Sequence, residues 1–159
     1  MAAGLILPLL EISIRPARLE DIDTIVSFNL ALAFESERIQ LEPEVLHQGV
    51  EALLRDPGKG FYLIAECAGQ SVGQTMVTFE WSDWRNKNWW WLQSVYVAPS
   101  SRRRGVFRAL YDQVESRAAR EGASGLRLYV EQENRDAQST YSALGMRPGR
   151  YHLYERGDA

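Results

Sequence analysis

The sequence predicts an α/β fold, an α+β arrangement in which a mixed sheet is covered by helices. Three observations support this. Two stretches with helical spacing precede three consecutive β-type stretches, which favours an antiparallel part of the sheet. A strand, a helix and a strand then follow between residues 89 and 130, and such a crossover makes its two strands parallel. The length of 159 residues is typical of one domain, so we expect a single domain over 1–159.

The first elements follow from alternation and from helix signals. Residues 11–18 alternate, with Ile12 and Ile14 on one side, which predicts a short strand. Residues 21–34 carry apolar side chains at helical spacing with acids in the first turn, where the helix dipole favours them. Pro43 is typical of the first turn of a second helix, which ends at Pro57-Gly58.

The middle of the chain is expected to form the antiparallel part. Residues 61–67 and 71–80 are β-type stretches joined by Ala68-Gly69-Gln70, which predicts a hairpin. Residues 81–88 are polar and are expected to be irregular, and 89–97 is a third β-type stretch.

The last third predicts the crossover and a final strand. Residues 105–121 repeat apolar side chains every four positions, and Gly122 supplies the stop, so we expect a helix there. A strand over 126–130, a helix over 134–144 and a strand over 151–155 complete the expected order, β-α-α-β-β-β-α-β-α-β.

Composition excludes several classes of function. A net charge of −3 argues against nucleic acid as a partner, because phosphate binding depends on Lys and Arg. The single cysteine, Cys67, excludes an internal disulfide framework and a cysteine-based zinc site, and we expect no metal. Residues 1–10 are apolar but lack a basic n-region and are too short to span a bilayer. We therefore expect them to be a loosely ordered extension of a cytoplasmic protein with no membrane partner.

The segment 95–110 has the sequence of a strand, a short basic loop and the start of a helix. The unpaired N–H groups of a helix N-terminus attract anions, Gly105 permits close approach, and Arg102, Arg103 and Arg104 add positive charge. An ordinary connecting turn with a solvated basic face would explain the same residues. The segment lacks the Gly-Lys-Ser/Thr ending of a P-loop, so ATP and GTP are disfavoured.

A second segment begins at Asn134, which is suited to cap a helix. Tyr141 lies two helical turns later on the same face of that helix. Taken alone, such a tyrosine is more often a half-buried packing residue than a catalytic one.

Together the two segments resemble the acetyl-CoA signature of the GNAT superfamily of N-acetyltransferases. The pyrophosphate loop of that family, Gln/Arg-x-x-Gly-x-Gly/Ala, falls on Arg102, Gly105 and Phe107. The last position departs from the pattern, because Phe107 replaces a glycine or alanine. The helix motif Asn-x-x-Ala-x-x-x-Tyr-x-x-x-Gly-Phe/Met falls on Asn134, Ala137, Tyr141, Gly145 and Met146.

The resemblance implies a GNAT-like fold, with the sheet splayed between the fourth and fifth strands to admit acetyl-CoA as co-substrate. It implies direct transfer of the acetyl group to a primary amine in a ternary complex, with Tyr141 protonating the leaving thiolate. The residues matched to cofactor contacts are Val95, Tyr96, Val97, Arg102, Arg103, Arg104, Gly105, Val106, Phe107, Arg108, Asn134 and Tyr141.

A general base is harder to place, because the stretch 89–97 contains no carboxylate. Glu80, at the end of the preceding stretch, is the first candidate, and Glu35 and Glu37 after the first helix come next. A solvated surface carboxylate remains the competing interpretation of each. His47 and His152 are assigned no role.

We expect the acceptor to bind near the first two helices and the tryptophan-rich stretch 81–91, which holds all five tryptophans. These rings would form an aromatic wall for an amine or, alternatively, a dimer interface, and we expect a homodimer. The candidate substrate residues are Glu35, Trp81, Asp83, Trp84 and Gln93. A small-molecule amine and a peptide N-terminus both remain open as acceptors. The alternative function is a non-catalytic acyl-CoA-binding or regulatory module.

Overall fold

The structure is a computed structural model that describes residues 11–157. The extension expected over residues 1–10 lies outside the described residues. The chain forms two compact units, divided between Leu128 and Tyr129. Among the described residues, no helix has both the length and the apolar character needed to cross a bilayer.

The first unit contains most of the regular structure. Its elements in chain order are β1 (Ile12–Pro16), α1 (Ile22–Glu37), α2 (Pro43–Arg55), β2 (Gly60–Cys67), β3 (Gln70–Ser82), β4 (Lys87–Val97), α3 (Val106–Arg120) and β5 (Gly125–Leu128). The second unit contains one helix, α4 (Arg135–Ala143).

The five strands form one mixed sheet in the order β1-β2-β3-β4-β5. Each neighbouring pair from β1 to β4 is antiparallel, and β4 pairs with β5 in parallel. The mixed α/β fold predicted from the sequence is therefore confirmed, including the crossover through α3.

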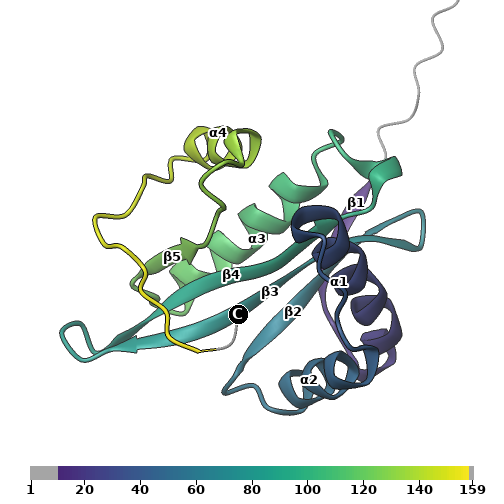
Figure 1. Ribbon diagram of the computed structural model, residues 1–159, viewed down its shortest axis with the longest axis horizontal. Coiled ribbons are helices and arrows are strands. Elements are labelled where there is room, and N and C mark those ends of the chain that lie inside the picture. Colours follow the sequence, from purple (N-terminus) through teal and green to yellow (C-terminus); the bar gives the residue numbers. More distant parts are fainter. Residues whose placement is uncertain (1–10, 158–159) are drawn as a thin grey trace, which may run out of the picture. The chain divides into compact units, whose positions relative to one another are not determined.

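The two faces of the sheet are covered by different helices (Figure 1). On one face, Ile25 of α1 and Val50 and Leu53 of α2 form a buried cluster with Tyr62 and Ile64 of β2. The other face is covered by α3. The guanidinium group of Arg117, in α3, lies 3.9 Å from the centre of the Phe61 ring of β2. Because side chains alternate along a strand, each β4 residue faces either α1 and α2 or α3.

Two details of the strands differ from the prediction. The stretch 81–88, expected to be irregular, instead extends β3 to Ser82 and begins β4 at Lys87, so the turn is confined to residues 83–86. The final strand expected over Tyr151–Glu155 is not formed, since these residues have no regular secondary structure. A strand needs a neighbouring strand for its N–H and C=O groups, and a local segment of sequence does not show whether such a neighbour exists.

The start of α1 is joined to β1 by a partly buried ion pair. Arg15 donates to both carboxylate oxygens of Asp21 at 2.8 Å, and the N–H of Arg18 donates to the same carboxylate at 2.7 Å. Arg15, then the N–H of Arg18, hold the pKa of Asp21 below its ordinary value of 3.8. This contribution to stability is therefore present above pH 4 and is lost as the pH falls through the lowered pKa.

Replacing Asp21 by asparagine should destabilise the protein at pH 7 by roughly 1.5 to 3 kcal/mol, the usual contribution of a charge-assisted hydrogen bond. The difference in melting temperature from the wild type should shrink as the pH falls below about 4, because Asp21 is protonated first in the unfolded chain and then, at its lowered pKa, in the folded protein. Thermal unfolding between pH 7 and pH 3 measures both effects. Asp23→Asn is the matched control, since the Asp23 side chain is 97% exposed. Equal losses in the two variants would contradict the assignment.

Candidate functional site

The loop between β4 and α3 has the backbone of an anion site. After a short 3-10 turn at Pro99–Ser101, Arg103 (φ 59°) and Gly105 (φ 84°) adopt left-handed conformations, and α3 begins at Val106. Its N-cap is Gly105, so no capping side chain accepts from the first-turn N–H groups. The N–H groups of the first turn and the helix dipole therefore create a positive electrostatic potential in front of the N-terminus of α3.

The start of α3 is held against the sheet by a close approach at Gly73 of β3. A Cβ atom on Gly73 would lie 2.9 Å from the carbonyl oxygen of Tyr96 and 3.1 Å from Cγ1 of Val106. Only glycine leaves room for Val106, which is buried. The first turn of α3 is thus fixed directly over β3 and β4.

The arginines in and just after the loop fall into two groups, those that form ion pairs within the protein and those that do not. Arg102 turns toward α1, where its guanidinium pairs with Glu35, and its Nε donates to the carbonyl oxygen of Val97 at 2.8 Å. Arg108 pairs with Asp112, one turn later in α3, at 2.8 Å. Arg103 and Arg104 are exposed, and within the described residues neither forms an ion pair. These two side chains are the ones free to meet an anion at the helix start.

Glu35 belongs to the last turn of α1, which extends to Glu37, so the expectation that it follows the helix is corrected. Its carboxylate also accepts from the hydroxyl of Tyr96 at 3.2 Å. Arg102, as the main cause, lowers the pKa of Glu35, whereas burial, followed by Glu35, raises the pKa of Tyr96. The structure thus brings together Glu35, Tyr96 and Arg102, three residues predicted to belong to the site.

A β-bulge interrupts β4 just before Tyr96. The register changes from Met76 opposite Gln93 to Gln74 opposite Tyr96, so β4 has one more residue than β3 over this interval. Ser94 adopts a left-handed conformation with φ 48°. For a residue other than glycine this costs roughly 1 to 3 kcal/mol and persists only where the surroundings enforce it.

Beyond the bulge, one edge of β4 has no paired strand within residues 11–157. The pairing of β4 with β5 covers Trp89–Leu92 and ends there. The N–H of Ala98 donates to the carbonyl oxygen of Val72, so this N–H group faces β3. Because alternate residues of an antiparallel strand face the same way, the N–H groups of Val95 and Val97 face the opposite edge, which we call the open edge of β4. The ladder between the fourth and fifth strands thus ends before Val95, as the expected splay requires.

Three polar side chains from three elements meet beneath the bulge. Nε2 of Gln74 donates to Oδ1 of Asn29 at 2.8 Å and to the carbonyl oxygen of Ser94 at 3.4 Å. Nδ2 of Asn29 donates to the hydroxyl of Tyr62 at 3.1 Å. Burial raises the pKa of Tyr62. A chain of hydrogen bonds therefore links β2 and α1, through Gln74 of β3, to the backbone of Ser94.

Glu80 lies in another part of the sheet. Its carboxylate accepts from Nε1 of Trp91 at 2.5 Å and pairs with Arg127 of β5 at 3.0 Å. It lies opposite Trp89, five residues along β3 from Thr75, which corresponds to roughly 17 Å. The structure therefore does not bring this candidate base together with the bulge.

The candidate substrate residues also lie in different parts of the first unit rather than at one site. Gln93 lies next to the bulge, where its side-chain amide donates to the hydroxyl of Thr78 at 2.5 Å. Trp81 lies at the far end of β3, and Asp83 and Trp84 lie in the hairpin turn. Trp81 and Trp84 are 62% and 86% exposed. Only Glu35 and Gln93 of this set therefore lie near the open edge of β4.

Asn134 and Tyr141 belong to the second unit. Asn134 caps α4, because its Oδ1 accepts from the N–H of Ala137 at 3.1 Å. This is the capping role that its sequence position predicts. Tyr141 is half-buried on the same helix, and burial raises the pKa of its hydroxyl above the ordinary value of 10.

Phe107 follows Val106 in the first turn of α3 and is half-buried. Its ring packs at a tilt against Tyr111 of the same helix, with ring centres 6.2 Å apart. This contact accounts for an aromatic residue in the loop without requiring its ring to bind an anion.

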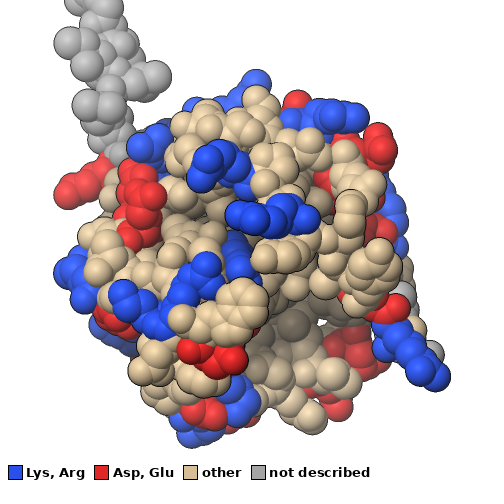
Figure 2. All heavy atoms as spheres, turned by 90° about the vertical axis from the view of Figure 1, so that its left-hand side faces the viewer, with Lys and Arg blue, Asp and Glu red and all other residues tan. Residues whose placement is uncertain are grey.

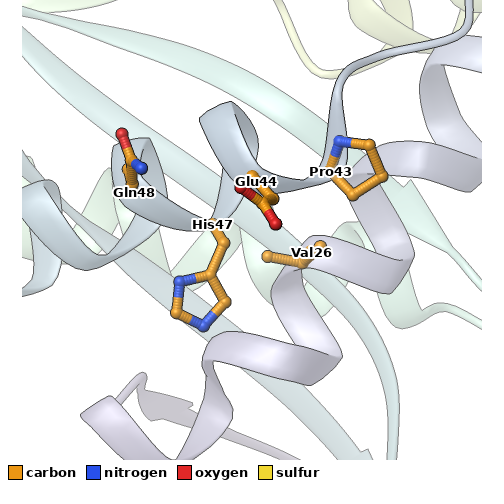
Figure 3. Close-up of a pocket in the computed structure, with 5 residues that line it drawn as sticks. All are labelled: Val26, Pro43, Glu44, His47 and Gln48. Atoms are coloured by element: carbon orange, nitrogen blue, oxygen red, sulfur yellow. The ribbon is translucent and has the colours of Figure 1, made fainter.

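Two other surface features do not coincide with this site. A hollow of about 430 Å³ between α1 and α2 is lined by Val26, Pro43, Glu44, His47 and Gln48 (Figure 3). None of these is a candidate site residue. Side chains of both charges, Lys and Arg as well as Asp and Glu, are visible in Figure 2. Residues 11–157 include no cluster of three or more metal-binding side chains.

Sequence reasoning missed the bulge and the chain of polar residues below it, Gln74, Asn29 and Tyr62. Ser94 is not a residue type that favours a left-handed backbone, so the sequence carried no turn signal there. A weaker signal was present: Gln74 and Thr75 are polar in the middle of a strand where both faces are buried, and Asn29 lies on the inner face of α1. Buried polar side chains of this kind need partners, and their partners are at the bulge.

Comparison with known proteins agrees with this geometry. Residues 26–146 match the model of the Acetyltransferase (GNAT) family. A solved structure of a possible acetyltransferase from Clostridium difficile 630 is 45% identical, with a TM-score of 0.88 over 93% of this chain and 98% of that one. A mycothiol acetyltransferase of Corynebacterium aurimucosum is 32% identical over 74% of this chain, and a thialysine N-epsilon-acetyltransferase of Bos taurus is 35% identical over 46%. The chain spans only 40% and 43% of the lengths of these two relatives.

Proposed function

The chain belongs to the Acetyltransferase (GNAT) family, and on that premise we propose that it transfers the acetyl group of acetyl-CoA to a primary amine. The observation that carries the proposal is the Gly105-capped start of α3, with Arg103 and Arg104 beside it and the open edge of β4 leading to it.

The chemistry of this donor set fits the pyrophosphate of CoA. Backbone N–H groups at the start of a helix bind phosphate oxygens regardless of side chain, so Phe107 is compatible with the loop. Arg103 and Arg104 would add charge-assisted hydrogen bonds. When bound, acetyl-CoA supplies a thioester carbonyl that a neutral amine can attack.

The open edge of β4 would orient the acyl end of the cofactor. The N–H groups of Val95 and Val97 face that edge, and strand edges bind extended ligands through such groups. An N–H directed at the acyl oxygen would also stabilise the negative charge that develops there. In this proposal, the bulge at Ser94 sets the direction of these donors.

Proton movements are assigned to two groups. Tyr141 would donate its proton to the departing sulfur, and its raised pKa keeps the hydroxyl protonated at neutral pH. Arg102 pairs with Glu35 and lowers the pKa of its carboxyl group, so Glu35 attracts an ammonium group better than it removes a proton. Glu80 lies far along β3 from the bulge and pairs with Arg127. We therefore propose that the attacking amine enters neutral, having lost its proton to water.

A screen with acetyl-CoA and a panel of amines tests the proposal. Each primary amine, from polyamines and amino acids to peptides with a free N-terminus, is paired with its N,N-dimethyl derivative, which cannot form an amide. We expect CoA release and an acetylated product with primary amines only. The rate should rise with pH towards the pKa of the amine, as the neutral fraction grows. Cofactor binding without turnover on any amine would favour a non-catalytic acyl-CoA-binding module instead, which the absence of a carboxylate from β4 leaves open.

A further inference from the structure

The bulge at Ser94 is held by side chains from both faces of the sheet. Nε2 of Gln74 donates to the carbonyl oxygen of Ser94 at 3.4 Å, and Oγ1 of Thr75 donates to the carbonyl oxygen of Gln93 at 3.3 Å. Gln74 and Thr75 are adjacent in β3, so their side chains leave the sheet on opposite faces. They thus replace, one on each side, ladder hydrogen bonds that the extra residue disrupts.

Gln74 is itself fixed in place. It is fully buried, and its amide also donates to Asn29 of α1, which in turn donates to Tyr62 of β2. The Gln74 amide is thus held by a chain of hydrogen bonds that runs through α1 to β2. An amide anchored in this way leaves the Ser94 carbonyl little freedom to relax to an ordinary strand conformation.

Packing alone does not explain why position 74 is a glutamine, because this side chain leaves a buried oxygen atom without a hydrogen bond. Oε1 of Gln74 is buried and has no hydrogen-bond partner among the described residues. Buried acceptors are nearly always satisfied, so each exception calls for an explanation. A leucine or methionine would fill the same space without leaving an acceptor unpaired. The benefit of glutamine at this position lies in its two N–H groups, which bind Asn29 and Ser94.

We propose that Gln74 is a positioning residue for acyl transfer. It holds the Ser94 carbonyl inward, and thereby keeps the N–H groups of Val95 and Val97 directed at the open edge of β4, where the acyl oxygen is to be polarised. This inference rests on the proposed function, because it assigns an acyl thioester to that edge. Thr75 supports the same bulge from the face covered by α3.

The experiment compares wild type with Gln74→Met, which keeps the side-chain volume and removes both donors. The exposed Gln113→Met carries the same chemical change on α3 and serves as the control. We expect Gln74→Met to lower kcat by roughly 10- to 100-fold, below the loss seen when a direct oxyanion donor is removed. The KM for acetyl-CoA should stay within about threefold, since the loop at Arg103–Phe107 is untouched.

A second readout reports the polarisation directly and needs no amine. Acetyl-CoA labelled with ¹³C at the carbonyl is bound to each protein, and the carbonyl stretching frequency is measured by infrared difference spectroscopy. Wild type and Gln113→Met should lower this frequency relative to free acetyl-CoA, because hydrogen bonding weakens the C=O bond. Gln74→Met should lose most of that lowering. A merely structural role for Gln74 would not change the frequency in a folded variant.

The outcomes separate the two proposals. Unchanged kcat, or a reduced kcat with the wild-type carbonyl frequency, overturns the positioning role while leaving the proposed function intact. In another outcome, the carbonyl frequency is lowered in the wild type, this lowering is lost in Gln74→Met, and no amine is acetylated. That outcome supports the positioning role of Gln74 and overturns the proposed acetylation of amines. If Gln74→Met fails to fold, Thr75→Val is judged by the same two measurements, with an expected loss in kcat of roughly 3- to 10-fold because one of the two bulge contacts remains.

Discussion

Replacing Tyr141 by phenylalanine is expected to lower kcat by roughly 10²- to 10⁴-fold, the usual share of general acid–base catalysis. The substitution keeps the half-buried ring and removes only the hydroxyl, so the melting temperature and the affinity for acetyl-CoA should change little. Steady-state kinetics together with the dissociation constant for CoA measure the two effects separately. Tyr151→Phe is the matched control, because that tyrosine is 79% exposed.

The pH dependence of kcat provides an independent check on Tyr141. Burial raises the pKa of its hydroxyl above 10, so the acid form is retained through neutral pH and is lost only above that value. The wild type should therefore lose kcat on the alkaline side above about pH 10, and Tyr141→Phe should lack this decline. Equal kcat in the two proteins would reduce Tyr141 to a packing residue.

The parts of the fold that were predicted from the sequence are those fixed by local signals. Pro43 indicated the start of α2 and Gly122 the end of α3, and the turn residues between the β-type stretches 61–67 and 71–80 predicted the β2–β3 hairpin. The basic loop was placed correctly between β4 and α3, because a strand, a turn and a helix each have a distinct sequence pattern. The predicted strand at Tyr151–Glu155 was wrong, since a local sequence can show that a segment could pair but not that a partner exists.

The finer geometry of the site depends on contacts between residues far apart in sequence. Arg102 was predicted to bind an anion with its neighbours, yet it pairs with Glu35, and no local pattern distinguishes it from Arg103. The left-handed Ser94 is enforced by residues of α1, β2 and β3 rather than by its own type. Glu80 was chosen as a base for lying near the end of its strand, but the sheet register places it far from the bulge.

Reversing the charge of the two exposed loop arginines is expected to abolish tight binding of CoA. Each charge-assisted hydrogen bond contributes roughly 1.5 to 3 kcal/mol, so Arg103→Glu with Arg104→Glu should weaken the affinity by about 100-fold or more. The two carboxylates would also repel the pyrophosphate. Isothermal titration with CoA measures the change, and circular dichroism checks that α3 still forms. Arg102 is left intact because it joins the loop to Glu35.

The control is Arg85→Glu with Lys87→Glu, which changes the net charge by the same amount in the β3–β4 hairpin. Lys87 begins β4 and Val97 ends it, so these side chains lie roughly 30 Å along the strand from the loop. Weakening by general repulsion would appear in both double variants and would fade as added salt screens it. Weakening by loss of direct contacts would be confined to Arg103 and Arg104 and would persist in high salt. Equal affinities for CoA in the two double variants would place the pyrophosphate somewhere other than the start of α3.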